Sequence, residues 1–404
     1  MLGAIIGDIV GSVHEYKSKK SKKFKLFTKR SRFTDDTVMT IAVADALLNG
    51  GTADNFIDSM KKFGRLYPDA DCGGRFRQWL LSDDRSPYNS FGNGSAMRVS
   101  PCAWFANSLE EAERLAELSA SVTHNHPEGI NGAKATAAAI YLVRTGKRAS
   151  VKDYIQSKCG YDLSRSLDEI RPDYQFNETC QETVPEAITA LLESEGFEDA
   201  IRNAVSLGGD ADTLAAIAGS IAEAEYGIRH DTLTEGIRYL DDNLSAVINA
   251  WLDRGLSTGG RMVKNSGQLD YNHWHPKEFS KPRKIKAGFQ ISETQLARVR
   301  FGLWPRQMED KWFIYFENSR ICCHRSWTGY RIYEAEVKKG NTGYTIPEMT
   351  VERDAELYGC SDDSEDIRQF HYLIGCGILG LNLNAPIGKS DADLLSGWSR
   401  FGRG

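Results

Sequence analysis

The sequence predicts an all-α domain followed by a small α+β domain. Two observations lead to this prediction. Over the first two-thirds of the chain, apolar residues recur at helical spacing between Gly-rich turns, and alternating apolar and polar runs are almost absent. After Leu256 the composition changes to aromatic and β-branched runs, which are typical of strands.

The helical domain is expected to span residues 1–256. Its first clear helix, at 37–48, places apolar side chains on one broad face and ends at Asn49-Gly50-Gly51, a helix stop signal. Further helices with small, close-packing or apolar residues are expected at 109–122, 132–145, 185–193 and 213–226. Together these segments predict an all-α bundle joined by short loops.

The remaining chain is expected to contain a linker at 257–289, a small α+β domain at 290–385 and a loose tail at 386–404. The linker is rich in Gly, Ser, Asn, Lys and Pro. Within the domain we expect strands at 311–316 and 329–337, a turn at 317–319 and a helix at 363–379. We recognise no activity in this domain, and substrate selection or partner binding is the default hypothesis.

Two features of the C-terminal part resemble functional sites, but structural explanations fit them better. His273 and His275 have the spacing of a metal pair, yet no third ligand accompanies them. The many aromatic residues of the domain suit core and hairpin packing better than a platform for stacking bases.

Composition indicates a soluble protein without an evident nucleic-acid or membrane partner. The formal net charge is −5, with 41% hydrophobic and 26% charged residues. The sequence contains no run of about 18 consecutive apolar residues, so no transmembrane helix is predicted. The eight cysteines are scattered and form no C-x-x-C pair, which favours reduced thiols in a cytoplasmic protein.

The residues with the clearest chemistry form two acidic clusters, each directly before a predicted helix. Thr34-Asp35-Asp36 opens the helix at Val38, and Asp210-Ala211-Asp212-Thr213 opens the helix at Leu214. At a helix N-terminus the first carboxylate lies on non-helical backbone, so neighbouring Asp side chains are able to converge. Gly208 and Gly209 permit the sharp approach that such convergence requires.

Each cluster has two interpretations. Asp and Thr are favoured N-caps, and the helix dipole stabilises acids there by roughly 0.3–1 kcal/mol. However, one Asp is enough to cap a helix, and carboxylates roughly 4 Å apart repel by about 4 kcal/mol per pair at an effective dielectric near 20. A divalent cation is the usual remedy. Because every candidate ligand is an oxygen, Mg²⁺ or Mn²⁺ is favoured over zinc.

Four stretches, in this order, resemble the ADP-ribosylglycohydrolases, the family that includes the dinitrogenase reductase-activating glycohydrolase. The stretches are Gly3-Ala-Ile-Ile-Gly-Asp-Ile-Val-Gly11 with Glu15; Phe33-Thr-Asp-Asp-Thr37; Gly92-Asn-Gly-Ser-Ala-Met-Arg-Val-Ser-Pro101 with Thr123-His-Asn-His-Pro-Glu-Gly129; and Gly208-Gly-Asp-Ala-Asp-Thr213. Any one of them would be weak evidence, whereas all of them in sequence are specific.

The resemblance implies an orthogonal all-α fold, a centre of two Mg²⁺ or Mn²⁺ ions, and hydrolysis of a bond to C1″ of ADP-ribose. It assigns metal ligands to Thr34, Asp35, Asp36, Asp210, Asp212 and Thr213, with Asp212 bridging. Glu15 matches the catalytic acidic residue, as acid or base. Binding residues for the substrate are Gly92, Asn93, Gly94 and Ser95, around the diphosphate, and His126, beside the ligand.

Several of these assignments have plainer alternatives. Glu15 is a solvated helix-end acid in the simplest interpretation, and His126 a histidine whose hydrogen bonds are met within the fold. We expect His124 to be structural and Asp8 to serve packing or support of the ligands. The segment 17–32 holds nine Lys and Arg residues. It is interpreted as a mobile solvated loop, or as a flap that attracts the diphosphate or an ADP-ribosylated nucleic acid.

The sequence therefore predicts a metal-dependent ADP-ribosyl hydrolase whose substrate is an ADP-ribosylated protein. Arginine-linked ADP-ribose is favoured, because the motifs are closest in wording to those of the dinitrogenase-reductase type. Serine-linked, nucleic-acid-linked and O-acetyl ADP-ribose remain open alternatives. A non-catalytic ADP-ribose binder or scaffold is the competing class, although such a chain would be expected to lose at least one ligand or Glu15.

Overall fold

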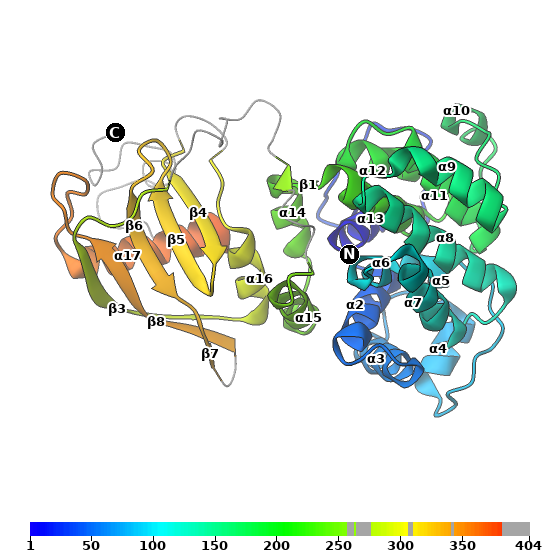
Figure 1. Ribbon diagram of the computed structural model, residues 1–404, viewed down its shortest axis with the longest axis horizontal. Coiled ribbons are helices and arrows are strands. Elements are labelled where there is room, and N and C mark those ends of the chain that lie inside the picture. Colours follow the sequence, from blue (N-terminus) through cyan, green and yellow to red (C-terminus); the bar gives the residue numbers. More distant parts are fainter. Residues whose placement is uncertain (257–261, 264–275, 306–309, 341–342, 382–404) are drawn as a thin grey trace. The chain divides into compact units, whose positions relative to one another are not determined.

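The computed structural model describes residues 1–256, 262–263, 276–305, 310–340 and 343–381 (Figure 1). They form two compact units. Unit 1 comprises Met1–Leu240 with Ala250–Val263, and unit 2 comprises Asp241–Asn249 with Lys264–Gly404. Unit 1 is helical apart from one short strand pair, and unit 2 holds an antiparallel sheet. The predicted change from helices to strands is therefore confirmed.

Unit 1 places a buried central helix among amphipathic ones. Its elements in chain order are α1 (Leu2–Gly11), α2 (Asp35–Leu48), α3 (Ala53–Leu66), α4 (Gly74–Leu81), α5 (Gly94–Met97), α6 (Ser100–Phe105), α7 (Leu109–Ser121), α8 (Pro127–Arg144), η1 (Arg148–Ser150), α9 (Val151–Tyr154), η2 (Ile155–Cys159), α10 (Leu167–Ile170), α11 (Cys180–Leu192), α12 (Phe197–Val205), α13 (Ala211–Tyr226), β1 (Ile228–Arg229), α14 (His230–Ile237) and β2 (Met262–Val263). Helix α15 (Asp242–Asp253) has residues in both units.

Helices α1 and α13 pack with their backbones almost in contact. Gly3, Gly7 and Gly11 recur every fourth residue along α1 and face small residues of α13. A Cβ atom added at Gly7 would lie 2.0 Å from the carbonyl oxygen of Ala215, and one at Gly3 would lie 2.2 Å from that of Gly219. The same close approach at Gly11 brings the end of α1 to the start of α13. This contact positions Glu15, just beyond α1, beside Asp212.

We expect Gly7→Ala to destabilise the protein by about 3 kcal/mol or more, because the added methyl group must separate two helix backbones. Urea unfolding measures this loss. A matched control is Gly196→Ala, where a Cβ atom meets nothing within 4 Å. The control should lose less than about 1 kcal/mol, the range of an N-cap change. Equal losses in the two variants would contradict the close packing of α1 on α13.

Unit 2 is built on an antiparallel sheet with strand order β3-β8-β6-β5-β4, and β7 pairs with β8. Its elements are β3 (Pro282–Ile291), α16 (Glu293–Phe301), β4 (Trp312–Glu317), β5 (Arg320–Arg325), β6 (Arg331–Glu336), β7 (Lys338–Gly340), β8 (Gly343–Glu352), α17 (Asp363–Tyr372) and η4 (Leu373–Ile378). Phe370 and Leu373 belong to the same apolar core as Trp312 and Tyr333 of the sheet, so α17 and η4 pack on one sheet face.

Two details of unit 2 differ from the sequence expectation. Strand β3 starts at Pro282, inside the segment 257–289 that composition indicated as a linker. The basic residues of β3 concealed a period of two, in which Ile285 and Ala287 face the core. The start of α15 also groups with unit 2, because Asn249 donates to the backbone and the carboxylate of Glu293. His273, His275 and the expected tail 386–404 lie outside the described residues.

The strands predicted at 311–316 and 329–337 correspond to β4 and β6, and the turn at 317–319 is present. Asn318 and Ser319 adopt φ angles of 50° and 59°, the left-handed values that a tight hairpin turn requires. Among the helices that the structure describes, none is long and apolar enough to cross a membrane.

Candidate functional site

The two acidic clusters occupy two helix N-termini, as their positions in the sequence suggested. Thr34 is the N-cap of α2, and its hydroxyl accepts a hydrogen bond from the Asp36 amide at 3.4 Å. Asp210 is the N-cap residue of α13 but makes no side-chain capping bond. Before it, Gly208 has a φ of 71°, and a Cβ atom at Gly209 would lie 2.4 Å from the Tyr174 ring. The glycines therefore provide the sharp approach to α13.

Asp8 fixes the start of α2 against α1. Its buried carboxylate accepts four hydrogen bonds, from the amide and the hydroxyl of both Thr34 and Thr37, at 2.5–3.1 Å. Burial nevertheless raises the Asp8 pKa to about 6, because these bonds compensate only in part for desolvation. Asp8 thus holds the backbone that carries Asp35 and Asp36.

The clusters meet although 177 residues separate Asp36 from Thr213. The Thr213 hydroxyl donates to Asp36 Oδ2 at 3.2 Å, and Asn93 Nδ2 donates to Asp210 Oδ2 at 2.8 Å. Asp212 Oδ1 accepts from the Thr213 amide at 3.0 Å. Asp36 Oδ1 is buried and has no hydrogen-bond partner. Helix capping accounts for Thr34 alone, so it does not explain why these acids are gathered here.

The acids are costly to keep ionised. Burial raises the pKa values of Asp35, Asp36 and Asp212 well above the ordinary range, and repulsion between neighbouring carboxylates adds to the effect. Burial also raises the pKa of Asp210 to about 6. Carboxylates that repel one another in this way are stabilised either by protonation or by a bound cation.

The side chains do not already surround a single point. Among the described residues, no three His, Cys, Asp or Glu side chains form a ready cation site. Instead, Asp210 and Asp36 accept hydrogen bonds from Asn93 and Thr213, respectively. The donor set fits a hard divalent cation, because it consists of carboxylate and hydroxyl oxygens and includes the unpartnered Asp36 Oδ1.

Glu15 faces the cluster from the loop after α1. Its Oε2 atom is buried without a hydrogen-bond partner. Burial, and next the nearby charge of Asp212, raise the Glu15 pKa to about 7. A carboxyl group with this pKa exchanges protons readily near neutral pH. Glu15 is therefore half-buried rather than fully solvated.

A cavity of about 460 Å³ lies over these acids. The expected site residues that line it are Glu15, Asp35, Asp36, Gly92, Asn93, Gly94, Asp210, Asp212 and Thr213. Thr34, Ser95 and His126 are not among its lining residues. Thr34 lies behind the wall, bonded to Asp8, and the Ser95 hydroxyl donates to the Gly129 carbonyl at 2.7 Å.

Asn93 links the glycine-rich loop to the acidic cluster. Its side-chain amide donates to Asp210 and, at 3.1 Å, to the Thr183 hydroxyl, while its backbone amide donates to the Glu178 carbonyl at 2.7 Å. The loop therefore has a fixed position relative to α13. The resemblance assigned the Asn93 side chain to substrate binding, but its amide makes hydrogen bonds within the protein.

The two histidines both make hydrogen bonds within the fold, and only His124 lines the cavity. His126 is the N-cap of α8, where Nδ1 accepts from the Glu128 amide at 3.2 Å and the ring lies against Phe91. His124 lines the cavity and is buried, with Nδ1 bonded to the Thr123 hydroxyl at 2.7 Å. Burial, and next the charge of Arg98, lower the His124 pKa well below its usual value. His124 is therefore the neutral histidine at this wall.

Sequence reasoning missed an aromatic and basic part of the cavity wall, formed by Arg75, Phe76, Tyr88 and Phe176. The Arg75 guanidinium lies over the Tyr88 ring and donates to the Tyr88 carbonyl. A signal existed for two of these residues. Gly73 is the N-cap of α4 and Gly74 is its first residue, and both line the cavity, so this glycine pair marks the stretch that carries Arg75 and Phe76.

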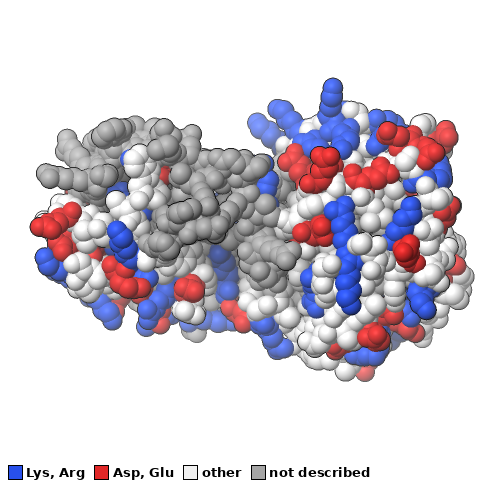
Figure 2. Space-filling model, turned by 45° about the horizontal axis from the view of Figure 1, so that its top comes forward, with Lys and Arg blue, Asp and Glu red and all other residues white. Residues whose placement is uncertain are grey.

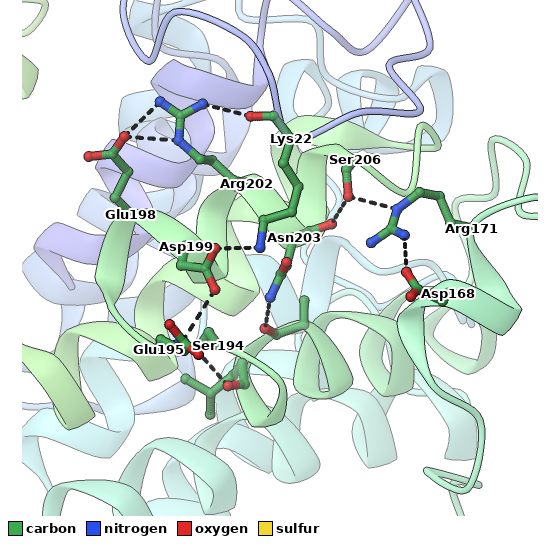
Figure 3. A network of polar contacts seen from close by, with 12 residues as sticks. Lys22, Asp168, Arg171, Ser194, Glu195, Glu198, Asp199, Arg202, Asn203 and Ser206 are labelled. Atoms are coloured by element: carbon green, nitrogen blue, oxygen red, sulfur yellow. Dashed lines mark hydrogen bonds and ion pairs between the residues drawn. The ribbon is translucent and has the colours of Figure 1, made fainter.

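The Lys-rich segment 17–32 is a loop without regular structure, and hydrogen bonds and an ion pair hold it against α12. Arg202 of α12, paired with Glu198, donates to the carbonyls of Lys22 and Phe24 at 2.8 and 2.7 Å, and the Lys22 amine pairs with Asp199 (Figure 3). Figure 2 shows Lys and Arg side chains projecting from the edge of unit 1 beside a group of Asp and Glu side chains. These bonds fix the backbone of the loop while most of its basic side chains remain exposed.

Known proteins resemble this chain in sequence. The model of a family described as ADP-ribosylglycohydrolase matches residues 1–254. Mouse ADP-ribosylhydrolase ARH3 is 28% identical over 308 residues, which cover 56% of this chain and 83% of the relative. ADP-ribosylarginine hydrolase Tri1 of Pseudomonas putida is also 28% identical and covers 56% and 70%. ADP-ribosyl-[dinitrogen reductase] glycohydrolase of Rhodospirillum rubrum is 24% identical and covers 64% and 95%.

The family match ends near the end of α15, so the sheet of unit 2 lies beyond it. It spans both acidic clusters, Glu15 and the glycine-rich loop that Asn93 joins to Asp210. Because the match covers more than half of the chain and includes every residue of this site, the chain belongs to the ADP-ribosylglycohydrolases, a family of hydrolases that act on glycosidic bonds.

Proposed function

We propose that this protein is a metal-dependent hydrolase that cleaves the bond between C1″ of ADP-ribose and a modified acceptor. The observation that carries this proposal is the buried meeting of two acidic helix N-termini below a cavity, with Glu15 facing Asp212. Membership of the family and the names of the relatives support ADP-ribosyl hydrolysis as the reaction.

Asp35 and Asp36 would hold one side of a pair of Mg²⁺ or Mn²⁺ ions, and Asp210, Asp212 and Thr213 the other. Thr34 would join the first set only by releasing its hydroxyl from Asp8. When bound, such a pair would lower the pKa of water and orient the hydroxyls of the distal ribose. The fit rests on the oxygen donor set, the unpartnered Asp36 oxygen and the raised pKa values of the acids. A divalent cation that bound here would displace protons from these acids.

The chain's own residues carry the remaining steps. Glu15, with a pKa of about 7, is able to accept a proton or donate one at the bond that breaks. Within the loop Gly92–Ser95, the Gly92 and Asn93 amides already donate to the Ser90 hydroxyl and the Glu178 carbonyl, so an amide for the diphosphate of the substrate would come from Gly94 or Ser95. Ser95 and His126 do not line the cavity, and their side chains contact Gly129 and Phe91 instead, so they would support the substrate-binding loop rather than contact the substrate.

The favoured acceptor is an arginine side chain of an ADP-ribosylated protein. Two of the relatives are named for arginine-linked ADP-ribose or for ADP-ribosylated dinitrogen reductase. Serine, nucleic-acid and O-acetyl linkages share the C1″ chemistry and differ only in the leaving group. The competing function is ADP-ribose binding without turnover. It is disfavoured by the retention of Glu15 and of all six expected ligands.

A panel of defined substrates tests the proposal. Arginine-linked, serine-linked and nucleic-acid-linked ADP-ribose are each incubated with the full chain in Mg²⁺, in Mn²⁺ and in EDTA, and free ADP-ribose is measured. We expect release from the arginine linkage with either cation and none with EDTA. Release from serine alone would overturn the arginine assignment. ADP-ribose binding without release from any substrate would favour the binder.

A further inference from the structure

A second cavity, of about 470 Å³, adjoins the first one at Glu15. Glu15, Tyr16 and Phe176 line both cavities, so they form a shared wall. The residues that line the second cavity alone are Ser18, Lys20, Pro172, Tyr174, Gln175 and Gly208. The two cavities therefore meet at these three residues.

The wall of the second cavity is fixed by hydrogen bonds between segments that are distant in sequence. Ser18 Oγ donates to the Gly208 carbonyl at 2.8 Å. Lys20 Nζ donates to the carbonyls of Arg171 and Leu207 at 2.8 and 2.6 Å, and also to that of Tyr174. Behind this wall, Arg171 is itself held by Asp168 and Ser206 (Figure 3). The cavity is therefore formed before any ligand binds.

The chemistry of the wall favours a planar cation. Tyr16 and Phe176 expose 75% and 47% of their surface and present aromatic rings, which attract guanidinium groups. Glu15 supplies a carboxylate, the partner whose geometry suits arginine. The lining contains one basic residue, Lys20, and three backbone carbonyls occupy its ammonium group. The wall therefore offers little to a phosphate.

We propose that the second cavity is the acceptor subsite, which takes the guanidinium and aliphatic stem of the modified arginine while the ADP-ribosyl group occupies the first cavity. Glu15 then lies between the two parts of the substrate, beside the bond that joins them. The inference rests on the proposed function and adds to it the place and the chemistry by which the acceptor is chosen. The basic loop 17–32 contributes its backbone and the anchored Lys20 to this subsite.

The test changes charge at Gln175, which is exposed and lines the second cavity alone. With arginine-linked ADP-ribose, Gln175→Glu should lower KM and Gln175→Lys should raise it, each about fivefold, with kcat nearly unchanged. Both shifts should shrink as salt rises from low ionic strength. Affinity for free ADP-ribose should stay at the wild-type value, because that ligand occupies the first cavity. Gln156→Lys on η2 repeats the charge change at an exposed residue that lines neither cavity, and it should leave KM unaltered.

Each alternative result has a distinct meaning. An unchanged KM in both Gln175 variants, or shifts of the opposite sign, would overturn the acceptor subsite while hydrolysis itself stands. Wild-type release from serine-linked but not from arginine-linked ADP-ribose would also overturn it and would leave the hydrolase in place. No release by the wild type from any linkage would contradict the proposed function, and the subsite with it.

Discussion

Asp212→Ala is expected to abolish turnover and the binding of Mn²⁺ while the protein stays folded. Asp212 starts α13 at the point where α1 and α2 meet it, and its charge raises the pKa values of Asp35, Asp36 and Glu15. Removing the carboxylate takes away the expected bridging ligand, so the rate of ADP-ribose release should fall on the order of a thousandfold or more. Release assays and calorimetric Mn²⁺ titration measure the two losses.

The same variant should be at least as stable as the wild type when both are stripped with EDTA. Acids whose folded pKa lies above the unfolded value make the folded state lose stability as pH rises between the two values. For Asp210 that window runs from 3.8 to about 6, and Asp36 extends it upward. Asp212→Ala relieves part of the repulsion, so its unfolding free energy should fall less steeply with pH than that of the metal-free wild type.

A matched control for this variant is Asp153→Ala on the exposed surface of α9, which should retain activity and the pH slope. Wild-type Mn²⁺ affinity in Asp212→Ala would remove Asp212 from the ligand set. A large loss of stability in the metal-free variant would show that its carboxylate is a structural group rather than a poised ligand.

Glu15→Gln is expected to lower kcat by about two to four orders of magnitude, the usual contribution of a general acid or base. The amide keeps the shape of the side chain but neither accepts nor donates a proton at pH 7. Binding of Mn²⁺ and urea stability should remain at the wild-type level. The wild-type pH profile of kcat should show a limb near the Glu15 pKa of about 7, and the variant should lack it.

The direction of that limb assigns the proton. A rate that falls above about pH 7 identifies the protonated carboxyl group as the acid, and a rate that falls below it identifies the carboxylate as the base. Glu186→Gln is the matched control, because burial raises the Glu186 pKa to about 7 as well, and Glu186 lines neither cavity. If Glu15→Gln turned over at the wild-type rate, the catalytic role would be wrong even if the metal pair were correct.

The fold could be predicted from sequence wherever periodicity and stop signals were strong. The helix at 37–48 was expected from its apolar face and Asn49-Gly50-Gly51, and α2 differs only in starting at Asp35. Strand β3 was missed because basic residues concealed its period of two. The contribution of α15 to unit 2 depends on hydrogen bonds between Asn249 and Glu293, which no local pattern contains.

For the site, the sequence located the charged groups but not the residues that hydrogen-bond to them or line the cavity beside them. The clusters were identifiable because acids and glycines precede two helices. Which histidine meets the cavity was not identifiable. His124 and His126 are two residues apart, and the start of α8 at Pro127 decides which ring turns inward. The role of Asn93 likewise depends on a contact with Asp210, 117 residues away. The shared wall at Glu15, Tyr16 and Phe176 arises only when the chain is folded.

The most direct test of the account is a crystal structure of the full chain grown with Mn²⁺, with anomalous scattering used to locate the ions. The account predicts two manganese peaks between the N-termini of α2 and α13, with the carboxylates of Asp36 and Asp212 turned toward them. Peaks elsewhere, or a cluster that retains the Asn93–Asp210 and Thr213–Asp36 bonds with no ion between the helices, would contradict it.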